Sequence, residues 1–186
     1  MSNRQHLFVF MIRPIVRCFF DRAYLRGRFF DHSHVGWLMG LRCIFWQKII
    51  GKNRHVPWPC SPLVSVGDPK LIEFHPDDMN NFWTFGTYFQ VWNDAKIVLG
   101  RGSYVGPNVG LITHNHDRED LDKHLPGEDI VIGERCWIGM NSVVLPGCVL
   151  GPRTTVGAGS VVTQSFPEGA CTLVGVPATP VRPLST

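Results

Sequence analysis

The sequence lacks any stretch of about 20 consecutive apolar residues, which is the length that a membrane-spanning helix requires. The apolar run near the start, from Leu7 to Ile12, is six residues long and ends at Arg13 and Pro14. No small-residue cleavage site follows it. We therefore expect neither a membrane-spanning segment nor a cleaved signal peptide.

The sequence also lacks any CxxC pair, and its cysteines do not form the pattern of a small secreted disulfide framework. We expect all six thiols to be reduced and the protein to be cytoplasmic. The six are Cys18, Cys43, Cys60, Cys136, Cys148 and Cys171.

Acidic residues are scarce in the first third of the chain. Residues 1–55 contain ten Lys or Arg against two acids, whereas residues 56–186 contain eight against thirteen. The net charge of +3 hides this asymmetry, which indicates that the two parts meet different surroundings. We expect no nucleic-acid partner.

A period of six residues runs from Ile132 to Ser165. A helix has 3.6 residues per turn and a half-buried strand alternates, so neither accommodates this period. A parallel β-helix does, because each unit forms one side of a coil and three units close it. The first place of each unit is aliphatic, and the fifth is small in five units: Ile132, Ile138, Val144, Leu150, Val156 and Val162, then Cys136, Ser142, Cys148, Thr154 and Ser160.

In this β-helix, the aliphatic residue points inward and the small residue occupies a narrow corner. The glycine that follows the aliphatic residue in four of the six units takes the turn. Imperfect early units begin at Val66 and Ile72, and the frame is clear from Leu99 and Val105 to Leu111. Stability comes from stacking, because one coil cannot bury its own interior.

We divide the chain into an N-terminal helical extension with a linker (1–60), a β-helix domain (61–167) and an extended C-terminal tail (168–186). A polar loop at about 113–129 interrupts the β-helix, and such loops often carry function. Within the extension we expect helices at about 16–30 and 34–50, with Pro14 preceding the first.

The extension has two interpretations. It either caps the open end of the β-helix or contacts an anionic membrane as a peripheral surface. On a helical wheel, Arg13, Arg17 and Arg28 fall on the side opposite Arg22 and Arg26, which argues against a clean amphipathic membrane face. Both interpretations stay open.

Two histidines, His114 and His116, lie where the repeat gives way to the loop, with Asp117 beside them. An isolated surface histidine carries little information. Two imidazoles at the single break in a repeat predict a site for general base catalysis, because imidazole titrates near neutral pH.

These features resemble the hexapeptide-repeat acyltransferases, and in particular the maltose, galactoside and colanic-acid-type O-acetyltransferases. The resemblance covers residues 97–183 well and residues 62–96 loosely. It implies a left-handed β-helix, a homotrimer with sites between subunits, and acetyl-CoA as co-substrate without a metal.

The resemblance also implies roles for individual residues in LGRGSYVGPNVGLITHNHD. An ungapped alignment puts the catalytic histidine on His116, whereas a shift of two residues selects His114 together with Asp117. Asn93 and Asp117 match positions at the acceptor sugar. The donor would lie along the later coils, at Trp137, Gly139, Met140, Ala158, Thr163, Gln164 and Arg182.

The sequence departs from the family where relatives carry cations for a coenzyme phosphate, because Gln164 and Thr179 stand at those places. The predicted function is O-acetylation of a sugar in a surface polysaccharide or its precursor. Alternatives are a sugar N-acetyltransferase or a xenobiotic acyltransferase, and less favoured are a γ-carbonic-anhydrase-like metal hydratase and a non-catalytic scaffold.

Overall fold

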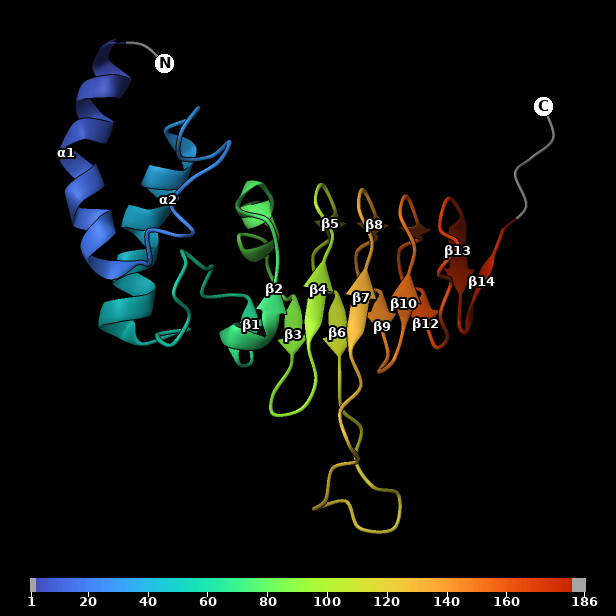
Figure 1. The fold of residues 1–186 in the computed structure, drawn as a ribbon. Helices are drawn as coiled ribbons and strands as arrows, with labels where there is room; N and C mark the ends of the chain where they lie inside the picture. Colours follow the sequence, from blue (N-terminus) through green and yellow to red (C-terminus); the bar gives the residue numbers. More distant parts are fainter. Residues whose placement is uncertain (1–2, 182–186) are drawn as a thin grey trace, which may run out of the picture.

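The computed structural model describes residues 3–181, with the side chains of residues 7–181. A three-sided prism of short parallel strands follows a pair of helices at its N-terminal end (Figure 1). The predicted parallel β-helix is therefore confirmed. No helix among the described residues is long and apolar enough to cross a membrane.

Each side of the prism is one sheet, and consecutive strands from β1 to β13 lie on different sides. Sheet A stacks five strands, sheet B four and sheet C five, and all neighbours are parallel except β13 and β14. Sheet A contains β1 (Ser65–Val66), β3 (Tyr88–Gln90), β6 (Gly110–Ile112), β9 (Val143–Val144) and β12 (Val161–Val162). Sheet B contains β2 (Ile72–Glu73), β4 (Ile97–Leu99), β7 (Ile130–Ile132) and β10 (Val149–Leu150). Sheet C contains β5 (Tyr104–Val105), β8 (Trp137–Ile138), β11 (Thr155–Val156), β13 (Thr172–Gly175) and β14 (Ala178–Pro180).

The six-residue period maps directly onto the coil. Every first-place aliphatic residue from Ile132 to Val162 is buried, and so is every small fifth-place residue. Burial raises the pKa of the Cys136 and Cys148 thiols, so both act as compact apolar groups.

The role predicted for the second-place glycine was wrong. Positive φ angles occur instead at the fourth place of five of the six units, for example 56° at Arg135 and 59° at Asn141. A Cβ atom at Gly100 would overlap the backbone of Gly133, and one at Gly133 would overlap that of Gly151. Glycine is needed at the second place because neighbouring coils approach closely there.

The first predicted helix was misplaced. Helix α1 runs Asn3–Phe19 with Pro14 inside it, rather than from about residue 16 to residue 30. A proline in a helix costs about 3 kcal/mol, but tertiary packing outweighs this cost. Val16 is fully buried, and a Cβ atom at Gly40 of α2 would lie 2.7 Å from its Cγ1 atom, so the two helices touch.

The second helix agrees with its prediction. Helix α2 (Val35–Cys43) continues as η1, a π-helical segment (Ile44–Ile50) that ends at Gly51 with φ of 94°. The buried Gln47 fastens η1 to the linker, because its side-chain amide donates to the carbonyl of Trp58 (3.1 Å) and accepts from the N–H of Cys60 (2.9 Å).

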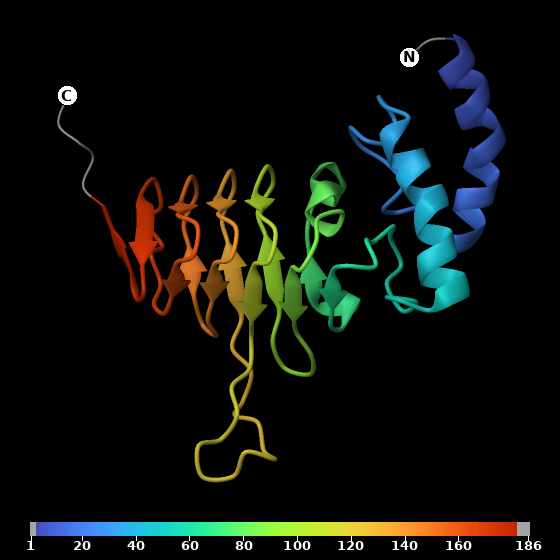
Figure 2. The ribbon, with the colours of Figure 1, turned by 180° about the vertical axis from the view of Figure 1, so that it is seen from behind.

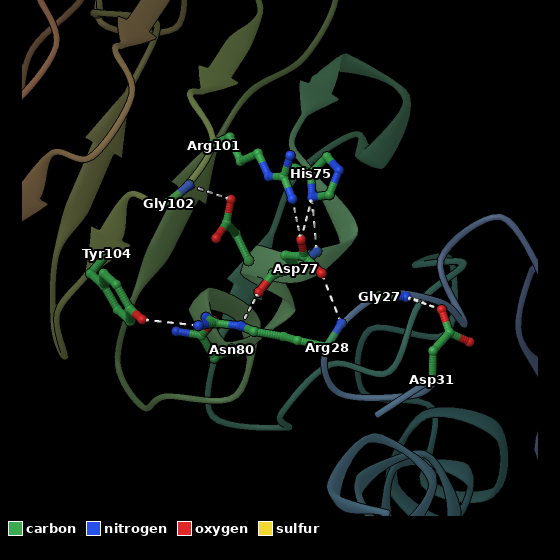
Figure 3. A network of polar contacts seen from close by, with 10 residues as sticks. Gly27, Arg28, Asp31, His75, Asp77, Asn80, Arg101, Gly102 and Tyr104 are labelled. Carbon is green, nitrogen blue, oxygen red and sulfur yellow. Dashed lines mark hydrogen bonds and ion pairs between the residues drawn. The ribbon is translucent and has the colours of Figure 1, made fainter. Parts of the chain in front are cut away.

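A polar cluster joins the segment between α1 and α2 to the prism (Figure 3). The Arg28 side chain donates to the carbonyl of Asp77 (2.6 Å), the amide oxygen of Asn80 (2.9 Å) and the hydroxyl of Tyr104 (3.2 Å). Asp77 and Asn80 belong to η3 (Pro76–Phe82), which follows β2, while η2 (Pro69–Leu71) precedes it. The extension therefore has a fixed orientation on the prism.

Candidate active site

The loop between β6 and β7 folds back on itself and projects from the corner between sheets A and B (Figures 1 and 2). Within it, the N–H of Leu125 donates to the carbonyl of Asn115 (2.9 Å), and the N–H of Asp117 to that of Lys123 (2.9 Å). At its base, the N–H of Glu128 donates to the carbonyl of Thr113 (2.9 Å). The polar sequence thus forms an irregular hairpin rather than an unstructured connection.

His114 lies at the base of this loop and is almost completely buried. Its Nε2 atom is 3.1 Å from an oxygen of Asp94, and its Nδ1 atom is 2.8 Å from the Thr113 hydroxyl. The ring stacks on Trp92, with 4.5 Å between the ring centroids. Both ring nitrogens face protein side chains at hydrogen-bond distance, so neither is open to an acceptor hydroxyl in this structure.

His116 is exposed two residues further along the loop. Its Nδ1 atom lies 2.7 Å from the carbonyl oxygen of Leu121, which can only accept, so Nδ1 carries the proton of this bond. Its Nε2 atom has no hydrogen-bond partner among the described residues. In this tautomer a lone pair on Nε2 is available to a hydroxyl group.

Asp117 and Asn93 have structural roles in the corner. An oxygen of Asp117 accepts from the N–H of Glu119 (2.8 Å), which stabilises the turn at the loop tip. Asn93 is exposed and adopts a left-handed conformation, with φ of 55°. Asn93 follows β3 and the loop follows β6, so His114, His116, Asp117 and Asn93 all come from the corner between sheets A and B.

Trp92 and Asp94, the partners of His114, are not among the predicted site residues. The hydrogen bond from His114 lowers the pKa of Asp94, and the N–H of Gly127 also lies 3.3 Å from this carboxylate. The relation is set by the register between coils, which the six-residue period does not reveal. Phe89 pairs with Leu111 across one coil, and that register puts Trp92 beside His114.

The candidate donor residues lie mostly on a different edge. Trp137 belongs to β8, and Gly139, Met140 and Ala158 lie at the corner between sheets C and A. Trp137 and Met140 expose 59% and 45% of their surface, so they form an apolar wall beside the small residues Gly139 and Ala158. Small residues beside an apolar wall fit the pantetheine arm of a coenzyme A thioester.

Thr163 and Gln164 are exposed at the corner between sheets A and B, two coils beyond the histidines. Arg182 lies outside the described residues. A single chain therefore places the histidines and the Trp137 wall on different edges of the prism. Among residues 3–181, no three His, Cys, Asp or Glu side chains form a group that could hold a metal ion.

Residues 129–164 match the family model described as "Bacterial transferase hexapeptide (six repeats)". The protein YJL218W of Saccharomyces cerevisiae, named as a candidate acetyltransferase, is 31% identical over 134 residues, which cover 66% of this chain and 67% of that protein. The chain belongs to the hexapeptide-repeat acyltransferase family. This confirms the predicted family and its left-handed β-helix.

Two further relatives of this hexapeptide-repeat protein have informative names. WbbJ of Escherichia coli, named as a candidate lipopolysaccharide biosynthesis O-acetyl transferase, is 32% identical over 104 residues (49% of this chain and 52% of WbbJ). The hexapeptide-repeat acetyltransferase VCA0836 of Vibrio cholerae, solved with acetyl coenzyme A, is 25% identical with a TM-score of 0.50 over 66% of each chain. The chain spans about half the length of the curated relatives that match it first.

Proposed function

We propose that this protein is an acetyl-CoA-dependent O-acetyltransferase that modifies a sugar hydroxyl of a surface polysaccharide or its precursor. The observation that carries this proposal is the state of His116. One of its ring nitrogens is fixed by the Leu121 carbonyl, and the other is free and exposed at the break in a hexapeptide β-helix.

The proposed reaction is a direct transfer. Nε2 of His116 accepts the proton of the acceptor hydroxyl while the oxygen attacks the thioester carbonyl of acetyl-CoA. The tetrahedral intermediate collapses, the carbon–sulfur bond breaks, and the coenzyme A thiolate receives the proton from the imidazole. A base of this kind contributes about 10²- to 10⁴-fold in rate, and the route uses no metal.

His114 serves in this proposal as a positioning residue for the loop. Its contacts to Asp94, Thr113 and Trp92 anchor the first residues of the loop, from which the chain reaches His116. Asn93 and Asp117 flank the acceptor at the same corner.

The donor half of the site is proposed to come from a second copy of the chain in a homotrimer. The N–H of Gly139 donates to the carbonyl of Val156 (2.8 Å), so this amide is not available to an oxyanion. The adjacent N–H of Met140 has no acceptor among the described residues, and we assign it the oxyanion. Packing the sheet C–A corner of one copy against the A–B corner of the next would bring Met140 and His116 together.

The name of WbbJ supports a polysaccharide sugar as the acceptor. The structure of VCA0836 with acetyl coenzyme A supports acetyl-CoA as the donor. We place the enzyme in the cytoplasm, and the six free cysteines of the chain support this location. The donor would contact Trp137, Gly139, Ala158, Thr163 and Gln164.

The test is acetyl transfer from labelled acetyl-CoA to fractions that contain nucleotide sugars, lipid-linked oligosaccharides or polymer. We expect His116→Ala to reduce transfer by about 10²- to 10⁴-fold without changing the oligomeric mass. His32→Ala is the matched control, because His32 is exposed and lies far from the loop in sequence. Retained activity in His116→Ala, with loss in His114→Ala, would assign the base to His114 instead.

A further inference from the structure

The helix formed by α2 and η1 presents an apolar stripe to solvent. Leu38, Phe45, Trp46, Ile49 and Ile50 recur at a helical spacing, and all are exposed. Ile49 and Ile50 expose 65% and 52% of their surface, far more than a buried packing face would. An apolar face of this extent on a helix indicates a surface that is covered in use.

The charges around the stripe have one sign. Arg42, Lys52 and Arg54 are exposed beside it, and no acidic residue occurs between Asp31 and Asp68. An apolar helical face flanked only by cations, with a tryptophan on it, has the composition of a helix that lies at an anionic lipid interface.

A groove of about 550 Å³ continues the stripe toward the first coil of the prism. Its apolar lining includes Met39, Trp46, Ile50 and Leu63, and Arg42 and Lys52 also line it. The dimensions and the lining suit an apolar chain whose anionic headgroup meets the two cations.

The observed helix bounds remove the sequence argument against a membrane face. Arg22, Arg26 and Arg28 lie in the segment between α1 and α2, so they do not share a helix with Arg13 and Arg17. In Figures 1 and 2, the helix that continues α2 ends level with the body of the prism, whereas the loop between β6 and β7 projects well beyond it.

We propose that the α2–η1 helix docks on a bilayer that contains anionic phospholipid, with its apolar stripe in the headgroup region and one acyl chain in the groove. The inference about lipid binding stands on the surface itself. Its consequence, that the acceptor is carried on a lipid, rests on the proposed acetyl transfer.

The test uses the full-length protein and vesicles of phosphatidylcholine with or without phosphatidylglycerol. We expect co-sedimentation with the anionic vesicles only, and weaker binding at high salt because the cations are then screened. Arg42→Gln should weaken binding about fivefold, the equivalent of about 1 kcal/mol for one cation at an anionic surface.

The variant Ile49→Asp/Ile50→Asp should abolish vesicle binding while the protein stays folded, because both residues are exposed. Val176→Asp is the matched control, since Val176 is an apolar residue of the C-terminal hairpin that exposes 71% of its surface. Absence of binding to anionic vesicles, or full binding by the double variant, would overturn the proposal. The proposal would also be overturned if the parent protein did not bind vesicles and the double variant lost an oligomer that the parent forms. A second copy of the chain would then cover the stripe.

Activity on a water-soluble acceptor separates this proposal from the proposed function. If the double variant loses vesicle binding but keeps that activity, both proposals stand. If the parent protein binds vesicles but no acceptor takes the label, the proposed acetyl transfer is wrong and the proposed lipid binding still stands.

Discussion

The coils from β7 to β12 and the first coil of the prism bury their interiors in different ways. In the later coils, the buried first residue of each six-residue unit is aliphatic, and the buried fifth residue is small. In the first coil a chain of aromatic rings fills the interior, with centroid distances of 4.7–4.9 Å from Tyr24 through Trp58, Phe74 and Phe82 to Phe89. One region is specified by a repeated pattern, and the other by the shapes of particular residues.

This difference follows from position in the stack. A middle coil has a similar coil on each side, so identical side chains can stack along the axis. The first coil has a similar coil on one side only, and its other side must be covered by something that does not repeat. The aromatic rings and the segment before α2 provide that cover, so changes there should cost more than equivalent changes in the repeat.

Removal of a ring from the aromatic chain should have the largest effect on stability. Phe82 is fully buried and contacts Trp58, Phe74 and Phe89. We expect Phe82→Ala to lower the free energy of unfolding by about 4 kcal/mol, measured by urea denaturation at fixed protein concentration. Phe85→Ala is the control, because Phe85 is half exposed and should change stability by about 1 kcal/mol or less. Equal effects of the two variants would show that the buried aromatic chain does not stabilise the first coil.

The next largest effect should come from a methyl group between two coils. Gly100→Ala would drive its Cβ atom into the backbone of Gly133 and Glu134, which cannot move without separating the coils. We expect a loss of about 3 kcal/mol in the same denaturation assay. In the control Gly110→Ala, the new Cβ atom would lie 3.6–3.7 Å from the side chains of Ile112 and Val143, which is ordinary contact. A stable Gly100→Ala variant would show that the coils are not closely stacked there.

Neutralising Asp77 should have the smallest of these effects. Its carboxylate accepts from the N–H of Arg28 (2.8 Å) and from the Arg101 side chain (2.8 Å), and the first of these bonds is the main cause of its lowered pKa. We expect Asp77→Asn to cost about 2 kcal/mol at neutral pH. The control Asp120→Asn breaks an exposed ion pair with Lys123 and should cost about 0.5 kcal/mol or less.

The same variant gives a pH test. Because the folded-state pKa of Asp77 is lowered, its contribution is present above the ordinary carboxyl pKa and is lost as the pH falls through the folded value. The stability difference between the parent protein and Asp77→Asn should therefore shrink on acidification below about pH 4. Asp78, whose pKa is raised mainly by burial, is present in both proteins and cancels in the comparison. A difference independent of pH would show that the carboxylate charge does not hold the extension.

The sequence predicted the later coils well because each unit repeats one local solution. Ile138, Val156 and Val162 fulfil their predicted inward positions. The role of Gly139 was misjudged because its constraint comes from Ala158 and Val156 in the next coil, which are close in space and not in sequence. The first helix was misplaced because Pro14 is tolerated by packing between α1 and α2, which no local signal reveals.

The candidate site stays a prediction. The break in the repeat indicated the corner between sheets A and B, and the loop that carries His114 and His116 leaves the prism there, after β6. Local spacing could not distinguish the two imidazoles, because the difference between them depends on Asp94 one coil earlier and on Leu121 at the far side of the loop. The assignment of His116 as the base remains a proposal for the transfer assay to test.

The sequence by itself determined the parallel β-helix and the place where it is interrupted, because a six-residue period and its failure are properties of neighbouring residues. Only the tertiary structure decided which imidazole keeps a free nitrogen, where α1 begins, and which apolar stripe of the extension faces solvent. Those outcomes depend on contacts between residues one or more coils apart, whose energies local sequence does not record.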